Sequence, residues 1–188
     1  MSTPEWIIGI LAGTGLAAAS GFRVFLPMFV LSLAARMHWI ELNDHLSWLG
    51  SGTASVILGV AMVVEILAYL IPWVDHMLDV IAIPLAGIAG TLAVAALLKD
   101  TDPALTWTLA LIAGGGTATA VQAGTTATRA TSTATTGGLA NPLVSSTESF
   151  MSLVVSLLAV VAPVIGFLLV LLLFYLIYRL FRRKKSPS

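Results

Sequence analysis

The sequence contains no cysteine and very little charge. Of its 188 residues, only 10% are Asp, Glu, Lys or Arg, against about 25% in an average soluble domain. The absence of cysteine excludes disulfide bonds, thiolate chemistry and cysteine-ligated metal sites. The scarcity of charge leaves too little polar surface for a soluble domain of this length.

Catalytic signatures are also missing. The chain has no G-x-S-x-G motif, no phosphate-binding loop with lysine and no H-E-x-x-H motif. His38 and His45 are too sparse and too loop-like to indicate a metal site. We therefore expect a protein that is not an enzyme, with no catalytic residue, metal or cofactor, and no nucleic-acid partner.

Long apolar segments are what the chain has instead. Hydrophobic residues make up 58% of it and the mean hydropathy is +0.99. A helix needs about 20 residues to cross about 30 Å of hydrocarbon. The sequence therefore predicts an all-α, polytopic transmembrane helix bundle of about six spans in a single membrane domain, 1–188. Its apolar segments are 6–35, 53–71, 73–98, 104–140, 143–162 and 164–180.

Two of these segments are longer than one span requires and are interrupted by glycine. Segment 6–35 contains Gly13, Gly15 and Gly21, and segment 104–140 contains the glycines at 114–116. We expect both to be broken helices, packed in protein or facing a cavity. Pro163, between the last two segments, fits either a tight turn or a kink in one long helix.

The glycine patterns indicate an internal repeat. Residues 12–19 and 113–120 share A-G-x-G-x-A-x-A, and Leu-Ala followed by proline recurs at 67–72 and 158–163. We interpret the chain as two three-helix repeats, 5–99 and 103–182, each with a broken first helix. Because three spans is an odd number, the second repeat would have inverted topology, with a site near the midplane. The alternative is chance recurrence of small residues that promote helix packing.

Basic residues orient the predicted bundle. Arg182, Arg183, Lys184 and Lys185 belong to a basic tail, 182–188. The positive-inside rule places this tail in the cytoplasm, and six spans would place both termini there. Arg36 and Lys99 would then lie outside, against the trend.

Three ordered motifs carry a family resemblance. They are GFRVFLP at 21–27, EILAYLIPWVD at 65–75 and ATTGGLANP at 134–142. Together they resemble a bacterial membrane family known as domain of unknown function 4126, over nearly the whole chain. The resemblance implies a bacterial inner-membrane protein and brings no reaction, ligand or catalytic residue.

Ionisable residues inside apolar segments are the candidate site. Arg23 and Arg129 stand alone among apolar or small residues, where inserting an arginine costs about 2.5–3.5 kcal/mol. Helix N-termini at the glycine breaks, together with both guanidinium groups, could attract an anion. Alternatively, each arginine pairs with an acid or extends to the interface. Glu65 is the expected partner of Arg23, because it is the only acid well inside an apolar span.

Further polar residues complete the candidate path. Asp75 and Asp79 share a helix face and could bind a cation or proton, although acids also favour the first turn of any helix. Thr117, Thr119 and Asn141 could line a polar path or serve only helix packing.

Two functions remain open from the sequence, and an intramembrane enzyme ranks behind both. One is a small transporter or channel for an ion or small polar solute. The other is a non-transporting assembly, lipid-organising or regulatory protein. The expected partners are membrane lipid, the ion or solute, and, as an open alternative, a second copy of the chain. A polar cavity reaching the glycine breaks would favour transport, and a solid, fully paired core would favour the second function.

Overall fold

A computed structural model of the chain describes residues 3–99 and 101–183. Every regular element in these two ranges is helical, which confirms the all-α prediction. In chain order the elements are α1 (Thr3–Ser20), α2 (Phe25–Arg36), η1 (Asp44–Gly50), α3 (Gly52–Ala68), α4 (Pro72–Leu97), α5 (Pro103–Leu109), η2 (Ala110–Gly115), α6 (Gly116–Thr136), α7 (Asn141–Val161) and α8 (Pro163–Arg183).

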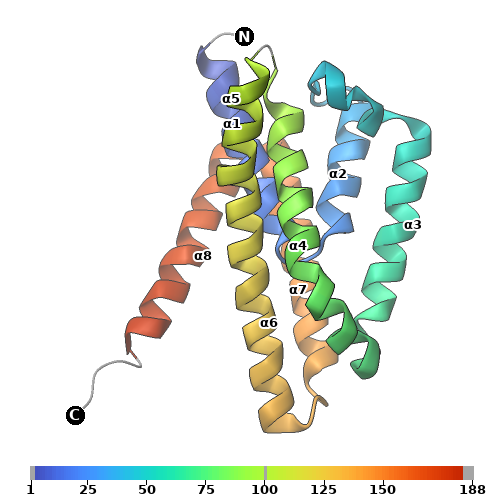
Figure 1. Ribbon diagram of the computed structural model, residues 1–188, viewed down its shortest axis with the longest axis vertical. Coiled ribbons are helices and arrows are strands. Elements are labelled where there is room, and N and C mark those ends of the chain that lie inside the picture. Colours follow the sequence, from blue (N-terminus) through green and yellow to red (C-terminus); the bar gives the residue numbers. More distant parts are fainter. Residues whose placement is uncertain (1–2, 100, 184–188) are drawn as a thin grey trace.

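Helices α1 and α2 form a hairpin. In Figure 1, α1 runs from the upper end of the molecule to about its middle, and α2 returns to the upper end. Contacts with the last turns of α4 agree with this path. Gly13 of α1 packs against Val94, and the N–H of Asn43, which follows α2, donates to the carbonyl of Ala96. The expected break in segment 6–35 is confirmed, but the segment does not cross as one span.

The break between α1 and α2 has local causes. Ser20 ends α1 with its hydroxyl bonded back to the carbonyl of Leu16, a bond that competes with the regular backbone pattern. Gly21 lies so close to α6 that an added Cβ would be 2.5 Å from the Cβ of Val121. Pro27 lies in the first turn of α2, where a missing N–H costs nothing.

The second glycine-rich segment is not broken. Elements α5, η2 and α6 continue as one helix, Pro103–Thr136, so our prediction of a break at residues 114–116 is wrong. A π-helical turn, η2, takes up the irregularity without ending the helix. Gly114, in η2, instead lets this helix approach α4, because a side chain there would collide with the carbonyl of Gly90.

The two helices that carry the glycine pattern are parallel. Gly13 and Gly114 both pack on Val94, and farther along Gly21 packs against Ala118 and Val121. An inverted repeat requires these helices to be antiparallel, so the inversion is not found for this pair. The shared pattern reflects the small residues that close helix packing requires.

By helix length and composition, fewer than six of the described helices qualify as membrane spans. Among the described residues, three helices could each cross a membrane: Met77–Leu97, Pro103–Thr136 and Asn141–Val161. A fourth is added if η1 and α3, bent by 64°, count as one span. The apolar helices Glu5–Ser20, Phe25–Arg36 and Pro163–Tyr175 are shorter. The fold is that of a helical membrane protein.

Pro163 follows a tight turn. An added Cβ on Gly166 would lie 3.0 Å from the Cα of Ala159, whereas seven residues of one continuous helix span about 10 Å. The turn sends α8 back along the direction from which α7 came, so α1 begins and α8 ends toward opposite ends of the molecule (Figure 1). This fold does not support the prediction that both termini lie on one side, because the α1–α2 hairpin begins and ends toward the same end of the molecule. Residues 184–188 of the expected tail lie outside the described part.

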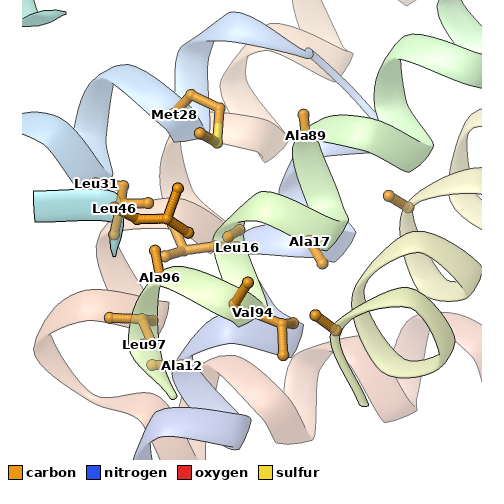
Figure 2. Close-up of a cluster of buried hydrophobic side chains, with 14 of the residues drawn as sticks. Ala12, Leu16, Ala17, Met28, Leu31, Leu46, Ala89, Val94, Ala96 and Leu97 are labelled. Carbon is orange, nitrogen blue, oxygen red and sulfur yellow. The ribbon is translucent and has the colours of Figure 1, made fainter. Parts of the chain in front are cut away.

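The main apolar core holds the α1–α2 hairpin against α4. Leu16 and Leu31 are fully buried in it, and alanine at many of the remaining positions allows the helices to approach closely. This packing holds the break between α1 and α2 inside the bundle. Figure 2 shows core side chains Ala12, Leu16, Ala17, Met28, Leu31, Leu46, Ala89, Val94, Ala96 and Leu97.

Candidate functional site

Charged side chains from distant parts of the chain converge beside the α1–α2 break. We call this group the charged centre and define it by Arg23 at the break, Glu65 on α3, Asp79 on α4, Arg129 on α6 and Glu148 on α7. Arg23 is 0% exposed and Arg129 is 1% exposed. Two guanidinium groups and three carboxylates give a formal charge of −1, two positive minus three negative.

Glu65 stabilises the first turn of α2. Its Oε1 accepts the N–H of Val24 at 2.7 Å, and its Oε2 accepts the N–H of Phe25 at 3.0 Å. A carboxylate is favoured at a helix N-terminus by the free N–H groups and the helix dipole. Glu65 thus occupies the place where a bound anion was expected. The prediction that it forms an ion pair with Arg23 is wrong, because the carboxylate within ion-pair distance of Arg23 is that of Glu148.

Arg23 is bound by α7 instead. Its Nε donates to the Ser149 hydroxyl at 2.9 Å, and its Nη2 donates to the Ser145 carbonyl at 2.8 Å. The same Nη2 lies 3.7 Å from the carboxylate of Glu148. Nη1 is buried and has no hydrogen-bond acceptor among the described residues. A buried donor without an acceptor is energetically costly. Nη1 of Arg23 can therefore bind one more acceptor with a gain in stability.

Arg129 is held by two acids. Its Nη1 donates to Asp79 Oδ1 at 2.6 Å, and its Nε donates to Glu148 Oε2 at 3.1 Å. Its Nη2 also donates to Glu148. Glu148 therefore lies near both arginines and joins them, and losing it would remove the carboxylate that the two buried guanidinium groups share.

Tyr69 contacts both guanidinium groups. Its ring centroid lies 4.2 Å from the Cζ of Arg23 and 4.2 Å from the Cζ of Arg129. Both distances are within the roughly 6 Å over which a cation is attracted to an aromatic face. The buried ring of Tyr69 thus offsets part of the repulsion between two neighbouring cations.

A cavity of about 420 Å³ reaches one edge of the charged centre. Asp79 and Arg129 form its charged wall, and the amide of Asn141 donates to the Thr133 hydroxyl at 3.1 Å in its polar wall. The side chain of Asp79 is 15% exposed, against 7% for Glu148. Asp79 is therefore the carboxylate that the cavity makes accessible. The remaining lining residues are Thr126, Ala130 and Ala134.

The threonines of α6 divide into two groups. Thr128 and Thr131 bond back to carbonyl groups of their own helix, whereas Thr126 and Thr133 line the cavity. Thr117 and Thr119, which we predicted to lie on the path, do not join the charged centre. Ten or more residues separate them from Arg129, about 15 Å along a helix. Thr119 instead packs against Gly87 of α4.

The structure brings together most of the predicted site residues. Arg23, Glu65, Asp79 and Arg129 belong to the charged centre, and Asn141 lines the adjoining cavity. Asp75 lies in the first turn of α4, and its side chain is outside the described part of the chain.

Four residues of the site were not predicted: Tyr69, Ser145, Glu148 and Ser149. The signal for two of them, Ser145 and Glu148, was present on α7, where buried polar residues recur every three or four positions. Such spacing places them on one helix face, and a polar face inside an otherwise apolar segment indicates a polar interior. This polar face consists of Asn141, Ser145, Glu148, Ser152 and Ser156.

The fold and the site together define a class: an all-helical membrane protein with a buried charged centre beside a helical hairpin. Within that class, residues 10–183 match the model of the family described as domain of unknown function (DUF4126), and the chain belongs to this family. The resemblance noted in the sequence is thereby confirmed. No curated protein and no solved structure matches the chain.

Proposed function

We propose that this protein is a small transporter or channel that moves an ion or a small polar solute through the charged centre. The supporting observation is that a cavity of about 420 Å³ ends on buried charges, Asp79 and Arg129. Ionisable residues that face the interior of a membrane bundle typically mark ion or substrate paths. The cavity volume also lies in the range of about 300–1,000 Å³ found for small-molecule sites.

The proposed location is a bacterial inner membrane, with the end of α8 in the cytoplasm. The basic residues near that end, including Arg179, agree with the positive-inside rule. The α6–α7 connection, beside the cavity, lies toward the same end of the molecule in Figure 1. The cavity would then open toward the cytoplasm, and α1 would begin on the other side.

A non-transporting assembly, lipid-organising or regulatory protein is the second candidate. The extensive pairing in the charged centre favours it, because Glu65 caps α2 and Arg129 binds two acids. In that case the charges hold α2, α4, α6 and α7 together and nothing passes between them. Neither candidate requires enzymatic chemistry or a cofactor.

Proteoliposomes on a solid-supported membrane distinguish the two candidates. Rapid changes of proton, Na⁺, K⁺, Cl⁻ and small-solute concentration should give a current or flux above that of protein-free vesicles. Thr133→Leu, which narrows the cavity without changing charge, should lower this signal by about tenfold. Thr135→Leu, the same change at an exposed position of α6, is the matched control and should behave as wild type.

Two results would contradict the proposal. A wild-type signal equal to that of protein-free vesicles for every ion and solute would favour the non-transporting candidate. An equal signal from Thr133→Leu and wild type, when both proteins elute and melt alike, would show that the transported species does not pass through this cavity.

A further inference from the structure

The identity of the transported ion follows from the same site, and this inference rests on the proposed function. We propose that the ion is the proton and that Asp79 is the carboxylate that accepts it from the cavity.

An anion is disfavoured by the charged centre. The helix N-terminus that could hold one is already occupied, since Glu65 accepts the N–H groups of Val24 and Phe25. The formal charge of the centre is −1, so the nearby field attracts cations. Arg129, the cation on the cavity wall, is already engaged by Asp79 and Glu148.

A metal ion is also a poor fit. Calcium takes about six to eight oxygen ligands, and magnesium requires near-octahedral coordination. Among the described residues no group of three or more His, Cys, Asp or Glu side chains could hold a metal ion. The cavity presents one carboxylate, Asp79, with threonine hydroxyls and an amide. A proton needs only one carboxylate oxygen and water to deliver it.

Charged and titratable groups face Asp79 from α6, α7 and the end of α3. When Asp79 is protonated, a hydronium ion in the cavity gives up a proton and becomes water, and one O–H bond forms on Asp79. The formal charge of the centre then changes from −1 to 0. The bond from Arg129 then loses its ionic character, and Arg129 depends more on Glu148. Among the described side chains, the surrounding groups are Arg129 on α6, Glu148 on α7 and Tyr69 at the C-terminal end of α3.

Glu148 is the next carboxylate on the path. It shares Arg129 with Asp79, and Nη2 of Arg23 lies 3.7 Å from it on the side of the break. Nη1 of Arg23 has no acceptor among the described residues. A water molecule or a moving carboxylate can therefore bind Nη1 without displacing an existing partner. The buried centre thus has the donor that a proton-conducting rearrangement needs.

Proton flux into vesicles tests the proposal. Proteoliposomes loaded with a pH-sensitive dye receive a potassium diffusion potential through valinomycin. Wild-type vesicles should acidify about tenfold faster than protein-free vesicles, and Asp79→Asn should remove most of this difference. Glu41→Gln is the matched control, because Glu41 is exposed in a loop and binds Lys99, which holds its pKa below the usual value. It should acidify as wild type does.

Each outcome of this experiment separates the two proposals. Acidification by Asp79→Asn at the wild-type rate would overturn the proton proposal. Wild-type acidification equal to protein-free vesicles, together with flux of another ion or solute, would overturn it and leave transport intact. Absence of flux for every ion and solute would contradict both the proton proposal and the transport proposal.

A second measurement uses the unaltered protein, so it does not depend on how Asp79→Asn folds. Carbodiimides modify carboxyl groups in their protonated form. Wild-type protein treated with a hydrophobic carbodiimide should carry the adduct on Asp79, faster as the pH falls, and not on the less exposed Glu65 or Glu148. Absence of an Asp79 adduct at every pH would contradict the proposal.

Discussion

At the scale of single residues, Glu65 has the largest structural consequence. It binds two backbone donors, on Val24 and Phe25, at a helix start inside the bundle. Water cannot replace these bonds in a hydrocarbon environment, where every backbone group must be satisfied by the protein. The carboxylate of Glu65 therefore supplies the hydrogen-bond acceptors that a helix start inside the bundle requires.

Replacing Glu65 should destabilise the fold in a graded way. Glu65→Leu leaves two buried donors without an acceptor and should lower the free energy of unfolding by about 2–3 kcal/mol. Glu65→Gln keeps one oxygen acceptor and should lose less. Unfolding in mixed detergent micelles, followed by circular dichroism, measures both variants. Equal stability of Glu65→Leu and wild type would show that the backbone donors find other partners.

At the scale of helices, α4 and the α5–α6 helix touch at their glycines. An added Cβ on Gly90 would lie 2.6 Å from the Cβ of Ala118 and 2.6 Å from the carbonyl oxygen of Gly114. Without a hydrophobic driving force between helices in lipid, such close approach supplies much of the packing energy. The contact also sets the position of α6, which carries Arg129 toward Asp79 on α4.

A pair of glycine substitutions should separate packing from helix propensity. Gly90→Ala overfills the contact and should destabilise the protein by about 1–3 kcal/mol. Gly124→Ala, on α6 with nothing within 4 Å of the added Cβ, should stabilise it by about 0.5–1 kcal/mol. Thermal unfolding of the two purified variants measures the difference. If both changed the melting temperature alike, the α4–α6 contact would not be tight in solution.

At the scale of the whole molecule, the α1–α2 hairpin determines the topology. A hairpin that enters and leaves on one side adds no net crossing. Helices α3, α4, α6, α7 and α8 then run alternately downward and upward in Figure 1. The beginning of α1 and the end of α8 lie toward opposite ends of the molecule, and we therefore expect them on opposite sides of a membrane.

The absence of cysteine makes this topology directly testable. Single cysteines at Glu5, Ser47 and Leu139 would all be exposed and free of background labelling. In intact bacterial cells, a membrane-impermeant maleimide should label Glu5→Cys and Ser47→Cys from outside. It should reach Leu139→Cys only after permeabilisation. Labelling of Glu5→Cys and Leu139→Cys from the same side would contradict the arrangement.

The sequence by itself determined the class of protein and much of the charged centre. Hydrophobic length is a local property, and it identifies membrane helices wherever they pack. A charge isolated among apolar residues is equally local, so Arg23, Glu65 and Arg129 could be recognised before their partners were known. The glycines of segment 6–35 likewise predicted a broken helix, because glycine weakens a helix at the position where it stands.

Only the tertiary structure decided which groups meet. Ser145 and Glu148 contact Arg23 across more than a hundred residues, and Glu65 binds the backbone beside Arg23 instead of its side chain. The carboxylates are chemically alike, so their partners depend on which helix faces lie opposite one another. Helix direction was also outside the reach of the sequence. Small residues favour close packing equally well between parallel and antiparallel helices, so the repeated glycine pattern could not tell one from the other.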